Sequence, residues 1–344
     1  MPPIRVLLAE DSPTVRFHLA RIVNAAPGMV VVGEARDGLE ALEMAATLEP
    51  DVISMDIRMP RMDGLEAARQ IMAQHPTPIV MVSGLLQEEI SLSMQALEAG
   101  ALAVVSKPPA RHDPAFARHE RRLIHTLTAM AGVHLVRRWT SAPRSNVAHI
   151  ALPGVHPEVV AIGASAGGPG ALVALLGSLT ESFALPVLLV QHLPDEFVDG
   201  FAQWIAPHLA LPLRVAEAGM PLEPATIYLA PAGRHLQVAR VGGLVAALTP
   251  VTPADRYCPS VDALFTSVAN VCGAFGVGII LTGMGDDGAA GLCALHEAGG
   301  RTFAQDPDSS VVYGMPRAAM ARGGVQRVLA LPELARVLST FAPR

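Results

Sequence analysis

The chain has 344 residues, of which 51% are hydrophobic and 16% charged, and its formal net charge is −6. This length predicts two domains with large buried cores, and the negative charge argues against a general nucleic-acid binder. Three cysteines (Cys258, Cys272 and Cys293) form no CxxC pair, which argues against a zinc site or a disulfide framework. The N-terminus shows no secretory signal pattern and no uncharged stretch reaches the length of a membrane span, so we expect a cytoplasmic protein.

The first third of the chain alternates short apolar runs with segments of helical spacing. The runs predict strands at 4–9, 30–32, 51–56, 79–83 and 103–108, and the spacing predicts helices at 14–24 and 38–48. Such alternation is typical of a parallel, doubly wound α/β sheet. Ligands of these sheets bind at the carboxyl ends of the strands.

Polar side chains follow four of these strands. Glu10 and Asp11 end the first strand, Asp56 the third, Ser83 the fourth and Lys107 the fifth. Three close carboxylates repel one another unless a cation neutralises them, and oxygen ligands suit Mg²⁺. Lys107 and Ser83 are placed to hold an anion bound against that metal. The sequence therefore predicts a metal and anion site at this edge of the sheet.

This pattern, with Asp56 inside MDIRMPRMDG, resembles the receiver domain of two-component response regulators over residues 1–122. The resemblance implies a flavodoxin-like fold with a five-stranded parallel sheet, and phosphorylation of Asp56 by a histidine kinase as phosphodonor. It implies that Ser83 and Lys107 contact the phosphoryl group. It also implies Mg²⁺ ligands from Glu10, Asp11, Asp56 and the carbonyl of Arg58. Val104 stands where the family usually has Tyr or Phe, so a rotating aromatic switch is not expected.

Residues 123–155 are expected to link the two domains. Helical spacing at 115–130 predicts one more helix, and the polar, basic and proline-punctuated stretch at 137–146 is typical of a tether. Its arginines lack the aromatic interleaving of a nucleic-acid-binding module. We therefore interpret them as a solvated linker, not as a nucleic-acid site.

The second domain is expected to span residues 156–344. Apolar runs predict strands at 159–162, 186–190, 226–230, 277–281 and 301–304, with helices at 171–176 and 291–298. This order predicts a second doubly wound, mostly parallel α/β sheet. Reactive side chains again lie just past strand ends, so we expect them to gather at one edge of that sheet.

Ser165 lies in the small-residue turn GASAGG, where a buried strand turns into a helix. A helix N-terminus offers free N–H groups and partial positive charge near its hydroxyl. This placement is typical of a serine nucleophile with a base nearby, although similar turns also cradle phosphate. His192 directly follows another strand and is the first candidate base, and His235 is the second. The adjacent Asp286 and Asp287 are the candidate acids that would orient the base.

The motifs GASAGGP, QHLP, YLAPAGRH, PSVD, LTGMGDDGAAG and AQDPDSSVVYGMPRAA occur in this order. Together they resemble the catalytic domain of CheB, the chemotaxis protein-glutamate methylesterase family. With the receiver, the resemblance covers nearly the whole chain. It implies a phosphorylation-regulated hydrolase that cleaves glutamyl methyl esters on chemoreceptors and deamidates glutamines, with no metal or cofactor in the catalytic domain. It also implies that the unmodified receiver packs over the catalytic edge and that phosphorylation loosens it.

The same resemblance implies roles for individual residues. Its catalytic triad is Ser165 as nucleophile, His192 as general base, and Asp287, which directly precedes a glycine, as the acid. The backbone N–H of Met284 is an expected donor to the oxyanion. Cys258 stands in YCPSVD where the family commonly carries Arg, so substrate positioning near that loop is expected to differ.

Parts of the sequence also fit three other functions. The turn also fits the G-x-S-x-G motif of α/β-hydrolases, but that fold runs Ser, acid, His, whereas this chain runs Ser, His, acid. A nucleotide-holding, phosphorylation-controlled binding module is disfavoured because G-x-G-x-x-G is missing. A DNA-binding output behind the receiver is disfavoured because the second half has no evident helix-turn-helix.

Overall fold

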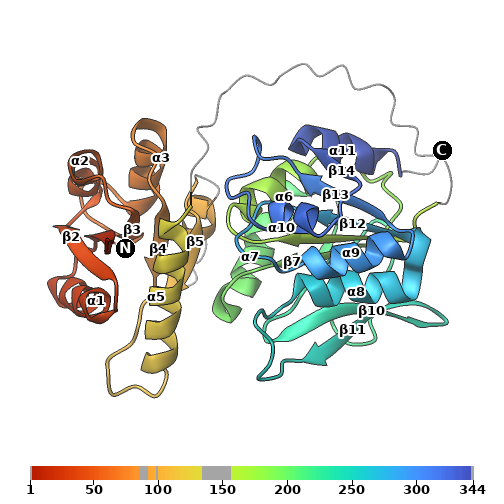
Figure 1. Cartoon of the computed structure of the whole chain (residues 1–344), viewed down its shortest axis with the longest axis horizontal. Coiled ribbons are helices and arrows are strands. Elements are labelled where there is room, and N and C mark those ends of the chain that lie inside the picture. Colours follow the sequence, from red (N-terminus) through yellow and green to blue (C-terminus); the bar gives the residue numbers. More distant parts are fainter. Residues whose placement is uncertain (1, 85–91, 98–99, 134–155, 342–344) are drawn as a thin grey trace. The chain divides into compact units, whose positions relative to one another are not determined.

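The computed structural model describes residues 2–84, 92–97, 100–133 and 156–341. These residues form two compact units, Met1–Leu135 and Val136–Arg344 (Figure 1). Among the described residues, no helix is long and apolar enough to cross a membrane. Each unit is described by itself below.

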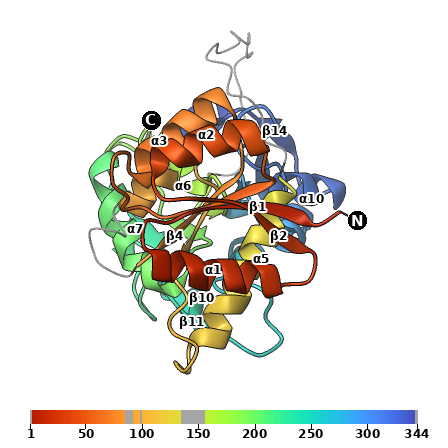
Figure 2. The same ribbon diagram turned by 90° about the vertical axis from the view of Figure 1, so that its left-hand side faces the viewer.

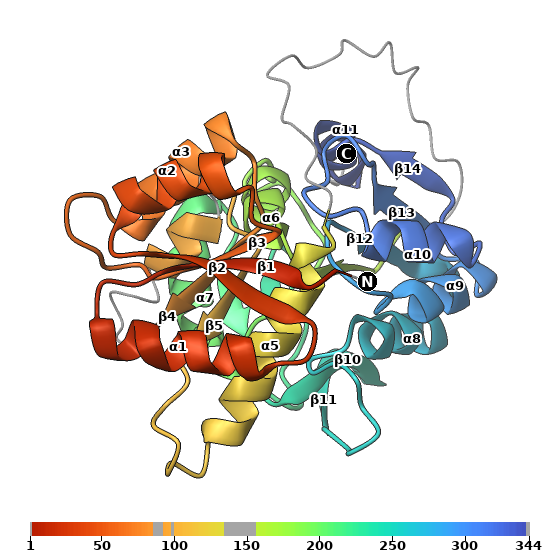
Figure 3. The ribbon, with the colours of Figure 1, turned by 60° about the vertical axis from the view of Figure 1, so that its left-hand side comes forward.

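The first unit is built on a five-stranded sheet of order β2-β1-β3-β4-β5, in which every pairing is parallel. Its strands are β1 (Ile4–Ala9), β2 (Met29–Ala35), β3 (Val52–Met55), β4 (Ile79–Ser83) and β5 (Ala103–Ser106). Its helices are α1 (Pro13–Ala25), α2 (Gly38–Leu48), α3 (Gly64–Gln74) and α5 (Phe116–Ala131), and residues 92–97 are also helical. Figures 2 and 3 show α1 and α5 on one face of the sheet and α2 and α3 on the other. The predicted flavodoxin-like fold is confirmed.

Helix α5 extends the first unit beyond the boundary expected near residue 122. Its apolar residues Leu123, Leu127 and Met130 recur at helical spacing and are buried, and the helix packs against the sheet strands β3, β4 and β5. Burial of this stripe holds the whole helix to the receiver. The predicted tether at 137–146 lies outside the described residues.

The second unit is built on a seven-stranded sheet of order β14-β13-β12-β6-β7-β9-β8, again with parallel pairings throughout. Its strands are β6 (Val159–Ala164), β7 (Val187–Gln191), β8 (Leu213–Val215), β9 (Ile227–Leu229), β12 (Gly276–Ile280), β13 (Arg301–Gln305) and β14 (Arg327–Leu329). Strands β10 (Arg234–Val241) and β11 (Gly243–Pro250) form a separate antiparallel hairpin. The predicted doubly wound domain is confirmed, and the hairpin is an addition that the sequence analysis missed.

Helices cover both faces of this second sheet. They are α6 (Gly168–Leu176), α7 (Val198–Ile205), α8 (Val261–Cys272), α9 (Ala289–Glu297), α10 (Met315–Ala321) and α11 (Leu331–Ser339). Helices α8, α9 and α10 share one buried cluster with the hairpin and with strand residues of one sheet face. Helix α6 packs with α11, on the opposite side in Figure 1.

Helix α8 carries a buried apolar stripe. Val261, Leu264, Phe265 and Val268 stand at i, i+3, i+4 and i+7, and all four are fully buried. At about 1.5–3 kcal/mol for each buried side chain, this stripe contributes roughly 6–12 kcal/mol as an upper estimate. The burial therefore fixes the position of the α8 N-terminus against the sheet.

The strand order also locates a crevice. The chain leaves β6 toward β7 on one side, whereas it leaves β12 toward β13 on the other. Strands β6 and β12 are neighbours, so the direction of winding reverses between them. In open α/β sheets ligands bind at the carboxyl ends of the strands at such a switch point.

Candidate active site and phosphorylation site

Ser165 is the first residue beyond β6, at the switch point. Its backbone N–H donates to the carbonyl of Thr282 at 3.1 Å, and its own carbonyl accepts from the N–H of Gly168 at 2.8 Å. Gly167, with φ of 74°, caps α6 in the left-handed conformation that glycine adopts without strain. The turn thus ties Ser165 to the loop after β12 and to the start of α6.

His192 is the first residue beyond β7, directly beside Ser165 in the sheet. The register pairs Ala164 with Gln191, so the next residues stand side by side on strands spaced about 4.8 Å apart. The side-chain amide of Gln191 donates to the carbonyls of both Ser165 and His192, at 2.9 and 3.1 Å. Gln191 therefore fixes the two backbones relative to each other, a function that the sequence analysis missed.

Asp287 meets the imidazole of His192 from the loop after β12. Its Oδ2 lies 2.8 Å from His192 Nε2, and the side chain is only 2% exposed. The carboxylate also accepts bonds from the N–H groups of Val261 and Asp262 and from the hydroxyl of Ser260, at 2.7, 3.0 and 2.9 Å. It therefore sits at the N-terminus of α8, where the helix dipole favours negative charge.

These bonds determine the ionisation of Asp287. Burial by itself raises the pKa of a carboxyl group, but here the bonds from His192 and from the N–H groups of Asp262 and Val261 outweigh burial. The pKa of Asp287 consequently lies below its ordinary value. The carboxylate is held charged behind the imidazole.

Asp286 points elsewhere. Its Oδ1 lies 3.2 Å from both the guanidinium of Arg256 and the hydroxyl of Tyr257, and its side chain is 46% exposed. The residue in contact with His192 is therefore Asp287, in agreement with the predicted choice between the two acids. The role of Asp287 as the catalytic acid stays a prediction.

Tyr257 was not foreseen at this site. Its ring stacks on the imidazole of His192, with centroids 5.3 Å apart and ring planes 1° from parallel. The guanidinium carbon of Arg256 lies 5.3 Å from the Tyr257 centroid. The pKa of Tyr257 is raised, chiefly because the side chain is partly buried, so the phenol stays neutral. A parallel ring restricts the plane of the imidazole, and its π face stabilises a nearby cation.

Gly283 allows the loop after β12 to approach the serine. A Cβ at this position would lie 2.8 Å from Ser165 Cβ and 2.2 Å from Met315 Sδ, closer than real atoms come. The carbonyl of Gly283 accepts from the N–H groups of Gly314 and Met315, at 3.1 and 2.9 Å. Within residues 156–341, no acceptor is found for the next N–H, that of Met284. This is the group predicted to meet an oxyanion.

Two further predicted residues belong to the same part of the second unit. His235, the second candidate base, is buried with Nδ1 bound to the N–H of Ser260 at 3.1 Å, so it lies behind the acid. Cys258 is half-buried, and burial, with the nearby carboxylates of Asp195 and Asp255, raises the pKa of its thiol. A neutral thiol thus stands at the position where the family commonly carries Arg.

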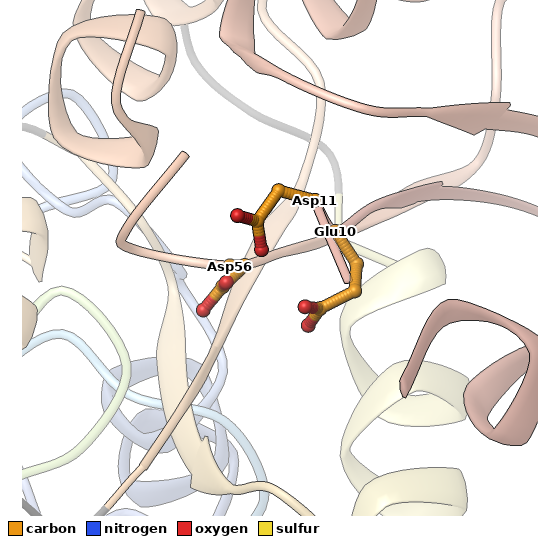
Figure 4. A group of neighbouring side chains, drawn as sticks. All are labelled: Glu10, Asp11 and Asp56. Carbon is orange, nitrogen blue, oxygen red and sulfur yellow. The ribbon is translucent and has the colours of Figure 1, made fainter. Parts of the chain in front are cut away.

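The first unit carries the predicted carboxylate cluster. Ligand oxygens of Glu10, Asp11 and Asp56 all lie within 4.8 Å of one another, and Figure 4 shows the three side chains together. Lys107 Nζ lies 2.8 Å from Asp56 Oδ1 and 2.9 Å from Glu10 Oε2. Four predicted members of this site, Glu10, Asp11, Asp56 and Lys107, therefore lie in one place.

Ser83 ends β4 and is fully buried, with its hydroxyl donating to the carbonyl of Gly84 at 3.0 Å. Arg58 lies two residues after Asp56 and lines a surface pocket together with Asp11. Val104, at the usual aromatic position, is buried on β5 opposite Met81 of β4. It provides no aromatic ring that could rotate.

The charges of this cluster fit a hard divalent cation. Burial raises the pKa of both Glu10 and Asp56; for Glu10 the charge of Asp56 adds to the rise, and the Lys107 ammonium offsets it in part. One lysine thus leaves the three carboxylates undercompensated. An all-oxygen donor set with an exposed member, Asp11, is suited to Mg²⁺ and its waters.

A receiver fold joined to a second doubly wound domain with a serine and a histidine–aspartate pair at its switch point defines a response regulator with a hydrolase as output. Residues 160–338 match the family model for CheB methylesterase, and residues 6–113 match that for the response regulator receiver domain. The chain belongs to the CheB methylesterase family.

Relatives match along the whole chain. A protein-glutamate methylesterase/protein-glutamine glutaminase of Myxococcus xanthus is 50% identical and aligns with 98% of this chain and 97% of its own length. One from Anaeromyxobacter dehalogenans is 46% identical, with 99% and 100% covered. The crystal structure of the Thermotoga maritima CheB methylesterase catalytic domain is 31% identical, with a TM-score of 0.51 over 54% of this chain and 98% of that one.

Proposed function

We propose that this enzyme hydrolyses glutamyl methyl esters on the cytoplasmic helices of chemoreceptors, and deamidates glutamines there, with Ser165, His192 and Asp287 as a catalytic triad. The observation that carries the proposal is the juxtaposition at one sheet edge. Ser165 and His192 follow paired residues of β6 and β7, and the imidazole is held by a buried carboxylate at 2.8 Å. The names of the relatives support the substrate class.

The proposal gives each ring nitrogen of His192 a role. Nε2 faces Asp287, so Nδ1 is the nitrogen left to take the proton of the Ser165 hydroxyl as its oxygen attacks the ester carbonyl. The protonated imidazole then gives that proton to the departing methanol. Water hydrolyses the acyl-enzyme by the reverse sequence of proton transfers. Asp287 keeps the tautomer in which Nδ1 is the free base.

Backbone donors stabilise the negative charge on the carbonyl oxygen in the transition state. The N–H of Met284 lies beyond Gly283, which approaches Ser165 closely. A donor of this kind typically contributes about 3–4 kcal/mol to the transition state. This part of the mechanism uses only groups of the chain itself.

The receiver is proposed to control the esterase by phosphorylation of Asp56 from a histidine kinase. Glu10, Asp11, Asp56 and the carbonyl of Arg58 would hold Mg²⁺, which neutralises charge between the carboxylates and the incoming phosphoryl group when bound. Lys107 and Ser83 would then contact that group. A phosphoryl group adds roughly one to two negative charges to the site, which is the local change that the output domain senses.

A cytoplasmic location is part of the proposal. Cys258, Cys272 and Cys293 are all unpaired, as expected in a reducing compartment. The proposed substrate segment of a chemoreceptor lies on the same side of the membrane.

The direct test is methanol release from methylated receptor membranes. The wild-type chain should release methanol, and Ser165→Ala should release none, because no other group can form the acyl-enzyme. Retained activity in Ser165→Ala would overturn the mechanism. Rapid hydrolysis of soluble p-nitrophenyl esters, without receptor activity, would instead favour a small-molecule hydrolase.

A further inference from the structure

A second buried histidine lies behind the proposed acid. His235 is at the start of β10 and is 5% exposed. Its two ring nitrogens face two parts of one loop: Nδ1 is 3.1 Å from the N–H of Ser260, and Nε2 is 3.3 Å from Asp255 Oδ2. The proposed triad does not use any of these three residues.

The hydrogen bond from Ser260 indicates the tautomer of this histidine. A backbone N–H can only donate, so Nδ1 of His235 accepts and carries no proton. The proton of the neutral ring is then on Nε2, which lies 3.3 Å from Asp255 Oδ2 but forms no hydrogen bond within the described part of the chain. The N–H and hydroxyl of Thr252 hold that carboxylate at 2.6 and 2.8 Å. His235 is thus fixed to the loop by its hydrogen bond from Ser260 and lies next to Asp255.

Ser260 passes this constraint on to the acid. Its N–H donates to His235, and its hydroxyl donates to Asp287 Oδ1 at 2.9 Å. The same hydroxyl accepts from the N–H of Ala263 at 3.2 Å and so caps α8. The orientation of Ser260 is therefore set from one side by His235, and it sets the orientation of Asp287 on the other.

The loop held by His235 also carries the ring that stacks on the base. Tyr257 lies between Asp255 and Ser260, the two residues that His235 contacts. We propose that His235 is a positioning residue for ester hydrolysis: it fixes Asp287 through Ser260, and the Tyr257 ring through the loop that Asp255 and Ser260 anchor. The inference rests on the proposed function, because it assigns His235 to the same site.

Three substitutions at His235 separate positioning from packing. His235→Asn places an amide oxygen near the position of Nδ1 and can still accept from Ser260. His235→Gln places its amide near Nε2 and can reach Asp255 but not Ser260. His235→Leu fills space and bonds neither. Methanol release from methylated receptor membranes by the full chain gives kcat and KM for each variant.

Ser267→Ala is the matched control. Ser267 joins the same two elements, because its hydroxyl accepts from the N–H of Val238 in β10 and donates to the carbonyl of Leu264 in α8, at 3.0 and 2.7 Å. It is similarly buried, at 9% exposure, but it does not contact the acid. Its loss should lower the melting temperature and leave kcat unchanged.

We expect kcat to fall about tenfold or more in His235→Leu and His235→Gln, the effect of one lost positioning hydrogen bond, with KM little changed. His235→Asn should retain kcat to within about threefold. Wild-type kcat in folded His235→Leu, or an equal fall in Ser267→Ala, would overturn the inference. If His235→Leu does not fold, equal kcat values in His235→Asn and His235→Gln would overturn the inference. An inactive wild type would overturn the proposed function itself.

Discussion

At the scale of single residues, the site depends on how the charge of Asp287 is maintained inside the protein. A buried carboxylate is costly unless hydrogen bonds satisfy it. Asp287 receives four such bonds from two segments, and its pKa falls below the ordinary value although burial opposes this. Asp286 has a solvent-exposed side chain and lacks this environment. Two chemically identical neighbours are therefore assigned different roles.

The first prediction separates these two acids. Asp287→Asn should reduce methanol release by about 10³–10⁴-fold, because an amide stabilises neither the productive tautomer nor the imidazolium. Asp286→Asn should retain most of the activity, since it loses only exposed contacts. Equal losses in the two variants would contradict the assignment.

The same carboxylate predicts a dependence of stability on pH. A folded-state pKa below the unfolded value of about 3.8 means that the stabilising contribution is complete above that value and is lost as pH falls through the folded pKa. The free energy of unfolding of the wild type should decline in this acid range more steeply than that of Asp287→Asn. Urea unfolding at several pH values measures the difference, and parallel curves would refute it.

Tyr257 gives a further prediction. Tyr257→Phe keeps the ring on His192 and loses only the bond to Asp286, so kcat should stay within about twofold. Tyr257→Leu removes the stacked face, and kcat should fall by about threefold to tenfold through the lost support of the imidazolium. Steady-state methanol release measures both. Identical behaviour of the two variants would show that the stack is incidental.

At the scale of elements, the ends of strands could be predicted and the N-terminus of α8 could not. The apolar runs before Ser165 and His192 are continuous and short, which is the pattern of a doubly buried strand, so their ends were visible. Ser260 caps α8 from a polar loop whose local sequence says nothing about Asp287. Their contact is created by the packing of α8 on the sheet, and the same is true of Tyr257 over His192.

In the first unit, the carboxyl groups that follow the strands repel one another, and this repulsion lowers the stability of the fold. Glu10 and Asp56 both have raised pKa values, chiefly through burial. A carboxyl group with a folded pKa above the unfolded value contributes most stability below the unfolded value and loses it as pH rises through the folded pKa. At neutral pH without a cation, the charged Glu10 is therefore destabilising.

Glu10→Gln should accordingly raise the melting temperature of the receiver at neutral pH without Mg²⁺, and should shrink the further rise that Mg²⁺ gives the wild type. Glu43→Gln, an exposed change on α2, serves as the matched control and should do neither. Calorimetry with and without Mg²⁺ provides the measurement. A lower melting temperature in Glu10→Gln would mean that its pairing with Lys107 outweighs the repulsion.

At the scale of the whole molecule, the chain joins a proposed phosphorylation site on one sheet to a proposed ester-hydrolysing edge on another. The motifs that predicted each half are local, and so the fold of each was foreseen. Communication between the two domains is not indicated by a local sequence motif. The usual aromatic position of a receiver is occupied here by the buried Val104, so the proposed signal from Asp56 does not pass through a rotating ring at this position.

The regulatory prediction is made at this scale. Acetyl phosphate with Mg²⁺ should accelerate methanol release by the wild-type chain, and the acceleration should be absent in Asp56→Asn. Asp51→Asn, an exposed carboxylate at the opposite end of β3, should respond like the wild type. An unchanged rate in the wild type would exclude phosphorylation control while leaving the catalytic proposal intact.

The most direct test of the central claim is covalent trapping of the nucleophile. The full chain is treated with a fluorophosphonate, and the modified peptide is mapped by mass spectrometry for the wild type and for His192→Gln. The account predicts one dominant modification on Ser165, which is strongly reduced in His192→Gln because the hydroxyl has lost its base. Labelling at another residue, or equal labelling of Ser165 in both proteins, would contradict it.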